Sequence, residues 1–132
     1  MARIVVIDDD TAVRQMLRFV LVHAGHEVLE AHDGRQGVQL LVEHMPVDLL
    51  ITDIVMSGQE GMETIVEVRK GYPALKILAI SGGGQSSAVN YLKMARLLGA
   101  NDTLSKPFEG EDLLGKVRDL IAGKPTGQAS PA

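Results

Sequence analysis

The sequence Ile4-Val5-Val6-Ile7-Asp8-Asp9-Asp10 joins a short apolar run to three consecutive acids. The same pattern returns in Asp48-Leu49-Leu50-Ile51-Thr52-Asp53, and Leu104-Ser105-Lys106-Pro107 ends a third run on a cation followed by proline. Apolar runs of this length are typical of parallel strands that are covered on both faces. If the first two runs are neighbouring parallel strands, their carboxylates meet at one edge of the sheet.

Several acids and one lysine in a small pocket are costly to assemble without a further cation, because burial and mutual repulsion both oppose ionisation. Magnesium together with a phosphoryl group would resolve that conflict. Mg²⁺ prefers one or two carboxylates combined with waters and phosphate oxygens. The arrangement therefore predicts phosphoryl chemistry on an aspartate.

The rest of the chain alternates between strand-like and helix-like patterns. Strands are predicted over Arg3–Ile7, Glu27–Ala31, Asp48–Thr52, Leu75–Ile80 and Asp102–Leu104. Between them, capping residues and glycines predict helices that begin near Asp10 or Thr11, Asp33, Glu60, Ser86 and Glu109. The first helix carries Val13, Leu17, Val20, Leu21 and Ala24 at helical spacing. The second is expected to turn inward Val38, Leu41 and Val42.

Five strands alternating with five helices predict an α/β protein with a doubly wound parallel sheet and helices on both faces. The run Glu27–Glu30 is more polar than the other strands and is expected at an edge. Ligands of such sheets bind at the carboxyl ends of the strands. The residues predicted at those ends are Asp8, Asp9, Asp53, Ser81 and Lys106.

Composition sets further limits. The 132 residues suffice for one domain, expected over residues 1–122, followed by a Gly/Pro/Ser-rich tail over 123–132 that is expected to be disordered. Net charge is −4 and the basic residues are scattered, so no direct binding of nucleic acid is expected. The absence of cysteine excludes disulfides and thiolate metal sites. With no long apolar span, no membrane insertion is expected, and the predicted localisation is cytoplasmic.

Each candidate residue has an alternative interpretation. Asp8 and Asp9 point in different directions at a strand end, so one can bind metal directly and the other through water, or both can belong to an acidic cluster at a helix start. For Asp10 the capping interpretation is preferred. Asp53 is predicted to be a nucleophile toward phosphorus because it lies singly beside the acid pair. A lone aspartate after a strand otherwise indicates a turn.

Lys106 is predicted to contact phosphoryl oxygens, although in isolation it is typical of a surface lysine. The hydroxyl of Ser81 can donate to the same group. The glycines at 82–84 match neither the Walker pattern nor GxGxxG and are interpreted as a flexible connection. The four histidines, at 23, 26, 32 and 44, do not fall at the predicted acidic edge and are interpreted as solvated.

Together these residues resemble the receiver domain of two-component response regulators over roughly residues 3–122. The resemblance rests on Val5–Asp10, Asp48–Met56, Gly61, Ile80–Ser81, Gly99–Ala100 and Lys106–Phe108, in this order on the alternating pattern. It implies the flavodoxin-like strand order 2-1-3-4-5. It also implies a phosphoprotein that works in phosphorelay signal transduction. Since no output domain is seen, a stand-alone, chemotaxis-regulator-like receiver is expected.

The resemblance assigns a role to each site residue. Asp53 would accept phosphate from a sensor histidine kinase or a histidine phosphotransfer protein, and the signal would pass to an unknown downstream protein. Mg²⁺ would be held by Asp9, Asp53 and the Val55 carbonyl, with Asp8 acting through water. Lys106, after which a cis proline bond is implied, would contact the phosphoryl group, and Ser81 would be the hydroxyl switch. The domain would act on itself alone and not as an enzyme with a separate substrate.

The sequence departs from the family pattern in three places. Ser57 replaces a common proline, the segment from Ser81 to Gly99 is a few residues longer than usual, and Thr103 replaces a Tyr or Phe that turns inward on activation. Because threonine cannot fill the volume of that aromatic ring, we expect the signal to be carried mainly by movement of the loop Gly82–Ser87 and the start of the fourth helix.

Two rival functions remain at this stage. A small phosphatase of the haloacid dehalogenase type also uses a strand-end aspartate, and Asp8-x-Asp10 fits its first motif superficially. Such an enzyme needs an acidic pair at a later strand end, whereas Lys106 is followed by a proline and a helix. A receiver-like scaffold that no longer switches is the other rival, and the complete set of acids, hydroxyl and lysine argues against it.

Overall fold

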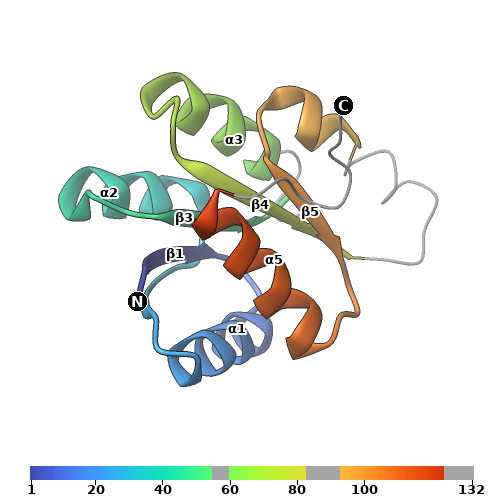
Figure 1. Ribbon diagram of the computed structural model, residues 1–132. Helices are drawn as coiled ribbons and strands as arrows, with labels where there is room; N and C mark the ends of the chain where they lie inside the picture. The colour runs from blue at the N-terminus through green and yellow to red at the C-terminus, as the bar shows by residue number, and fades with distance from the viewer. Residues whose placement is uncertain (55–59, 83–92, 124–132) are drawn as a thin grey trace.

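The computed structural model describes residues 1–54, 60–82 and 93–123, and Figure 1 draws the remaining segments in grey. The expectations for Val55, Ser57, most of the glycine-rich loop and nearly all of the tail therefore lie outside the described residues. The described residues form a five-stranded parallel sheet between two layers of helices (Figure 1). In this part of the chain no helix is both long and apolar enough to cross a bilayer.

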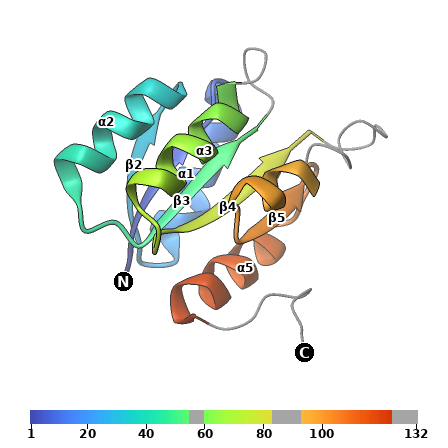
Figure 2. The same cartoon turned by 90° about the horizontal axis from the view of Figure 1, so that it is seen from above.

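All neighbouring strands run parallel, in the order β2-β1-β3-β4-β5, which confirms the doubly wound sheet (Figure 2). The strands are β1 Arg3–Ile7, β2 Glu27–Ala31, β3 Leu49–Asp53, β4 Lys76–Ser81 and β5 Asp102–Ser105. The more polar β2 is an edge strand, as its sequence predicted. The strands β3 and β4 each end one residue later than predicted, so Asp53 and Ser81 are themselves the last strand residues.

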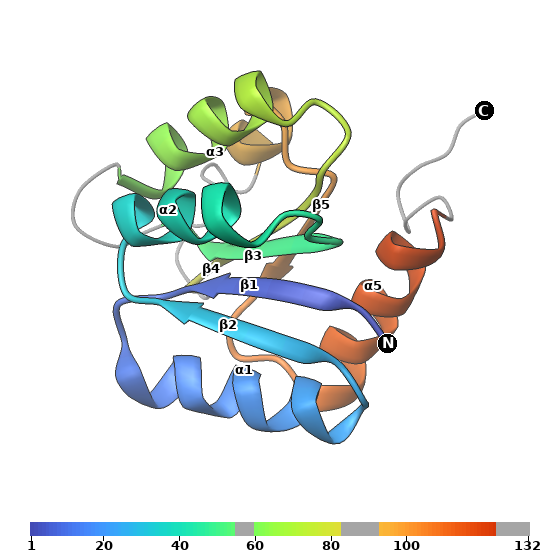
Figure 3. The same cartoon turned by 90° about the vertical axis from the view of Figure 1, so that its left-hand side faces the viewer.

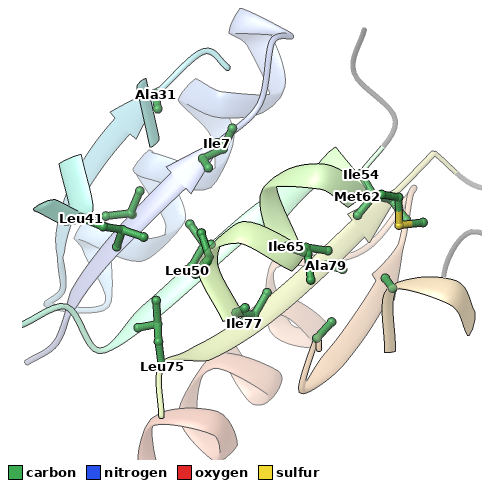
Figure 4. Packing of buried hydrophobic residues seen from close by; sticks show 14 of the residues in the cluster. Ile7, Ala31, Leu41, Leu50, Ile54, Met62, Ile65, Leu75, Ile77 and Ala79 are labelled. Atoms are coloured by element: carbon green, nitrogen blue, oxygen red, sulfur yellow. The ribbon is translucent and has the colours of Figure 1, made fainter. Parts of the chain in front are cut away.

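Helices cover both faces of the sheet. Their bounds are α1 Thr11–His23, α2 Gly34–His44, α3 Glu60–Gly71 and α5 Gly110–Ala122, and residues 93–98 are also helical. Figure 3 shows α1 and α5 on one face, and α2 and α3 on the other. The strands β1 to β4 therefore contribute to two cores, whereas β5 contributes Leu104 to one of them. Val5 and Ile7 belong to the core under α2 and α3, in which Figure 4 labels Ile7, whereas Ile4 and Val6 pack under α1 and α5.

The start of α1 confirms the capping prediction. The carboxylate of Asp10 accepts hydrogen bonds from the backbone N–H groups of Ala12 and Val13, at 3.0 and 3.3 Å. The helix buries Leu17 and Leu21 against the sheet. Ala24 shares their spacing but is exposed, because the helix has already ended at His23.

The inward face of α2 corrects one prediction. Leu41 is fully buried and Val38 packs against the core, but the Val42 residue is 65% exposed. The reason is the rotation of the helix, which presses Gly37 onto the side chain of Ile7 so closely that a Cβ at position 37 would overlap it. With Gly37 centred on the sheet, Val42 falls at the edge of the buried face.

Candidate functional site

The register of the sheet brings the predicted site residues to one edge. Ile7 pairs with Thr52. Asp8 and Asp53 are the next residues of the two segments, so they lie side by side. Carboxylate oxygens of Asp8, Asp9 and Asp53 all lie within 4.8 Å of one another. Farther along the same edge, the backbone N–H of Lys106 donates to the Ser81 carbonyl at 2.8 Å, which continues the pairing of β4 with β5.

The three carboxylates differ in exposure. Asp8 and Asp53 are 1% and 5% exposed, whereas Asp9 is open to solvent. Burial raises the pKa of Asp8, and the Asp53 charge adds to this, although the Asp10 N–H and Lys106 partly oppose it. The Asp10 N–H donates to Asp8 Oδ1 at 2.9 Å, so this acid is fixed from within its own turn.

Lys106 is the cation of the site. Its Nζ atom lies 3.1 Å from Asp53 Oδ2 and 3.4 Å from Asp8 Oδ2. Burial alone would lower the pKa of Lys106, but the charges and hydrogen bonds of Asp53 and Asp8 outweigh it, so the pKa lies above its ordinary value. The Lys106–Pro107 peptide bond is cis, as the resemblance implied.

Ser81 is fully buried at the end of β4, next to the strand that ends on Asp53. Its hydroxyl donates to the carbonyl of the adjacent Gly82 at 3.3 Å. The structure therefore places the hydroxyl at the predicted edge, in a local hydrogen bond. Val55, expected to offer a carbonyl to the metal, lies outside the described residues.

The donor set fits Mg²⁺. Three carboxylates within one small volume supply hard oxygen ligands, and the exposed Asp9 leaves an open side where waters or phosphate oxygens can complete an octahedral shell. One lysine does not balance three acids, so a divalent cation would relieve the repulsion among them.

Two structural contributors were not identified from the sequence. The first turn of α3 packs directly on the end of β3, because a Cβ at Gly61 would overlap the Asp53 carbonyl and the Ile54 backbone. Gly61 belongs to the resemblance, but the sequence shows only a glycine and not what it approaches. The second is Arg14, whose Nη1 donates to the Asp8 carbonyl at 2.7 Å. A lone arginine four residues after a helix cap carries no signal for such a contact.

The fold and the edge define a flavodoxin-like protein with an acidic, lysine-bearing site at the carboxyl ends of its strands. The family model for the response regulator receiver domain matches residues 4–118. The chain therefore belongs to the receiver domain family of two-component response regulators. This membership decides against the haloacid dehalogenase alternative.

A match to an individual relative supports the family assignment. The chain is 34% identical over 121 residues to the transcriptional regulatory protein CpxR of Klebsiella pneumoniae subsp. pneumoniae (strain HS11286), a match that covers 92% of this chain. The chain spans about half the length of that protein, since the match covers 50% of it.

Solved structures give the same result. A receiver domain protein from Clostridium thermocellum superposes with a TM-score of 0.85 at 30% identity, covering 93% of this chain and 96% of that one. The chemotaxis response regulator CheY4 of Vibrio cholerae superposes with a TM-score of 0.78 at 30% identity, covering 91% and 98% of the two chains.

Proposed function

We propose that Asp53 accepts a phosphoryl group from a phosphohistidine of a sensor kinase or phosphotransfer protein. The observation that carries this proposal is the placement of Asp53. It ends β3 beside Asp8 and Asp9 and lies 3.1 Å from the ammonium of Lys106. An Asp53 carboxylate oxygen would form a bond to phosphorus while the phosphorus–nitrogen bond of the donor imidazole breaks.

The neighbouring side chains have separate roles in this reaction. Asp9 and Asp53 would ligate Mg²⁺ together with the Val55 carbonyl, and the buried Asp8 would act through a water. The bound ion would neutralise charge on the phosphoryl oxygens. Lys106 would release part of its contact with Asp53 and donate to a phosphoryl oxygen, because its ammonium offers three donors.

The signal would start at Ser81. Turning its hydroxyl from the Gly82 carbonyl toward a phosphoryl oxygen exchanges a 3.3 Å hydrogen bond between neutral groups for a charge-assisted one. Such a differential contact is what shifts a conformational equilibrium. The altered surface would then bind a downstream protein or pass the phosphoryl group on in a relay. The same site would later hydrolyse its own acyl phosphate, with no separate substrate.

The test is labelling with acetyl phosphate and Mg²⁺, followed by intact mass measurement and peptide mapping. The parent is expected to gain one labile phosphoryl group on Asp53, and Asp53→Asn is expected to gain none. Asp33→Asn is a matched control, because Asp33 caps α2 outside the acidic cluster and asparagine caps equally well. Full labelling of Asp53→Asn would refute the assignment.

A further inference from the structure

Arg14 reaches back from α1 to the turn that carries the acids. Its Nη1 donates to the Asp8 carbonyl at 2.7 Å, and its Nε lies 3.1 Å from Glu30 Oε1 on the edge strand β2. The arginine side chain is 17% exposed, so water screens these contacts only partly. The guanidinium therefore bridges the acidic turn and the neighbouring strand.

The contact with the Asp8 carbonyl also fixes the backbone orientation of Asp9. The carbonyl of Asp8 and the N–H of Asp9 belong to one planar peptide unit, so fixing the oxygen fixes the plane from which Asp9 departs. The other side of Asp8 is held by β2, because its N–H donates to the Ala31 carbonyl at 3.1 Å. Arg14 thus completes the restraint of Asp8 and Asp9 in the turn between β1 and α1.

The charge of Arg14 is partly neutralised by Glu30. A free guanidinium beside a divalent site would repel the ion, and Glu30 reduces this repulsion because its Oε1 accepts from Arg14, although its Oε2 also lies 3.2 Å from the Nε of Arg18. The planar fork of arginine makes the carbonyl and carboxylate contacts at once, which the single ammonium of lysine does less well.

We propose that Arg14 is a positioning residue for the Mg²⁺ site, acting by fixing the Asp8–Asp9 peptide. The inference rests on the proposed function, in which these two acids serve the ion. Groups that orient metal ligands from outside the coordination shell raise affinity without touching the ion.

The experiment measures the Mg²⁺ dissociation constant by isothermal titration calorimetry, on folded protein at a temperature well below the unfolding transition of each variant. Arg14→Gln is expected to raise the constant about tenfold, at the lower end of the usual effect of losing an outer-shell partner. Arg14→Lys, which keeps the charge but not the fork, is expected to fall between parent and Arg14→Gln. Arg18→Gln is the matched control and is expected to bind like the parent, since Arg18 shares the Glu30 contact one turn further along α1.

Each outcome decides between two explanations. A purely structural role for Arg14 would lower the unfolding temperature in EDTA and leave the Mg²⁺ constant of the folded variant unchanged, which would overturn the inference. Equal weakening by Arg18→Gln would also overturn it, because the effect would then belong to the Glu30 cluster. A parent that binds no Mg²⁺ would overturn both the proposed metal site and this inference, whereas a parent that binds alongside an unaffected Arg14→Gln would overturn the inference alone.

Discussion

The Nζ atom of Lys106 lies 3.1 Å from Asp53 Oδ2, so the cation proposed to meet the phosphoryl group already holds the proposed acceptor. The same ammonium lies 3.4 Å from Asp8. One lysine therefore serves two buried carboxylates, and the exposed Asp9 adds a third negative charge to the group. Because one ammonium faces three carboxylates, the stability of the metal-free domain should depend on the charges of these residues.

Lys106→Met should destabilise the metal-free protein, because it leaves two buried acids without their cation. We expect a loss of about 1–2 kcal/mol, below the cost of breaking a fully buried pair, since the lysine side chain is 22% exposed. Urea denaturation in EDTA measures it, with the exposed Lys93→Met as control. Because the folded pKa of Lys106 is raised, this contribution is complete below pH 10.5 and is lost as the pH rises through the folded value. A constant difference at higher pH would contradict the explanation.

Asp8→Asn should act in the opposite direction on the metal-free fold. Burial raises the pKa of Asp8, so its charge costs folding free energy once the pH exceeds the ordinary value of 3.8. The amide oxygen can still accept from the Asp10 N–H, and we expect a gain of about 1 kcal/mol at neutral pH. Paired denaturation curves in EDTA and in Mg²⁺ test this. The added stability from Mg²⁺ should shrink in the variant, and an unchanged Mg²⁺ effect would show that Asp8 does not serve the ion.

The sequence predicted the site better than it predicted packing. Asp8, Asp53 and Lys106 were identifiable because each follows an apolar run, and parallel pairing brings such ends together. The inward placement of Val42 was wrong because helical spacing does not fix how a helix is rotated about its axis. That rotation depends on the contact of Gly37 with Ile7, which no local pattern records.

Gly61→Ala should disturb the end of β3, which carries the proposed acceptor, directly. The added Cβ would overlap the Asp53 carbonyl and the Ile54 backbone, so α3 must shift away. Overpacking of this kind costs about 1–3 kcal/mol, and we expect slower labelling of Asp53 as well. Gly71→Ala, at the other end of the same helix, meets nothing within 4 Å and should be neutral or slightly stabilising. Denaturation curves and labelling rates of both variants decide it, and equal behaviour would show that the close approach is unimportant.

We expect the folded protein to lose stability in mild acid because of His26. Its Nδ1 accepts the Ala2 N–H at 3.2 Å, a role that a protonated ring cannot fill. Burial lowers the pKa of His26, and the amino-terminal charge adds to this against the opposing effect of Asp48. The unfolded state therefore binds the proton more readily, so the contribution is complete above pH 6.5 and declines as the pH falls below it. His26→Gln should have a flatter dependence of unfolding temperature on pH across this range, and a parallel curve would contradict the assignment.

The conformational response should begin at Gly82. Its carbonyl accepts the Ser81 hydroxyl in the structure, and Thr103 is too small to fill the space that an aromatic ring would take on activation. Adding beryllofluoride as a phosphoryl mimic should therefore change amide exchange more in peptides covering residues 82–87 than around Thr103 or in α5. Gly82 has no Cβ, so a large backbone change at this position is sterically easy. Ser81→Ala should remove the change at 82–87 while Asp53 is still labelled. The strongest response around Thr103 and α5, with 82–87 unaltered, would show that the signal leaves by another route.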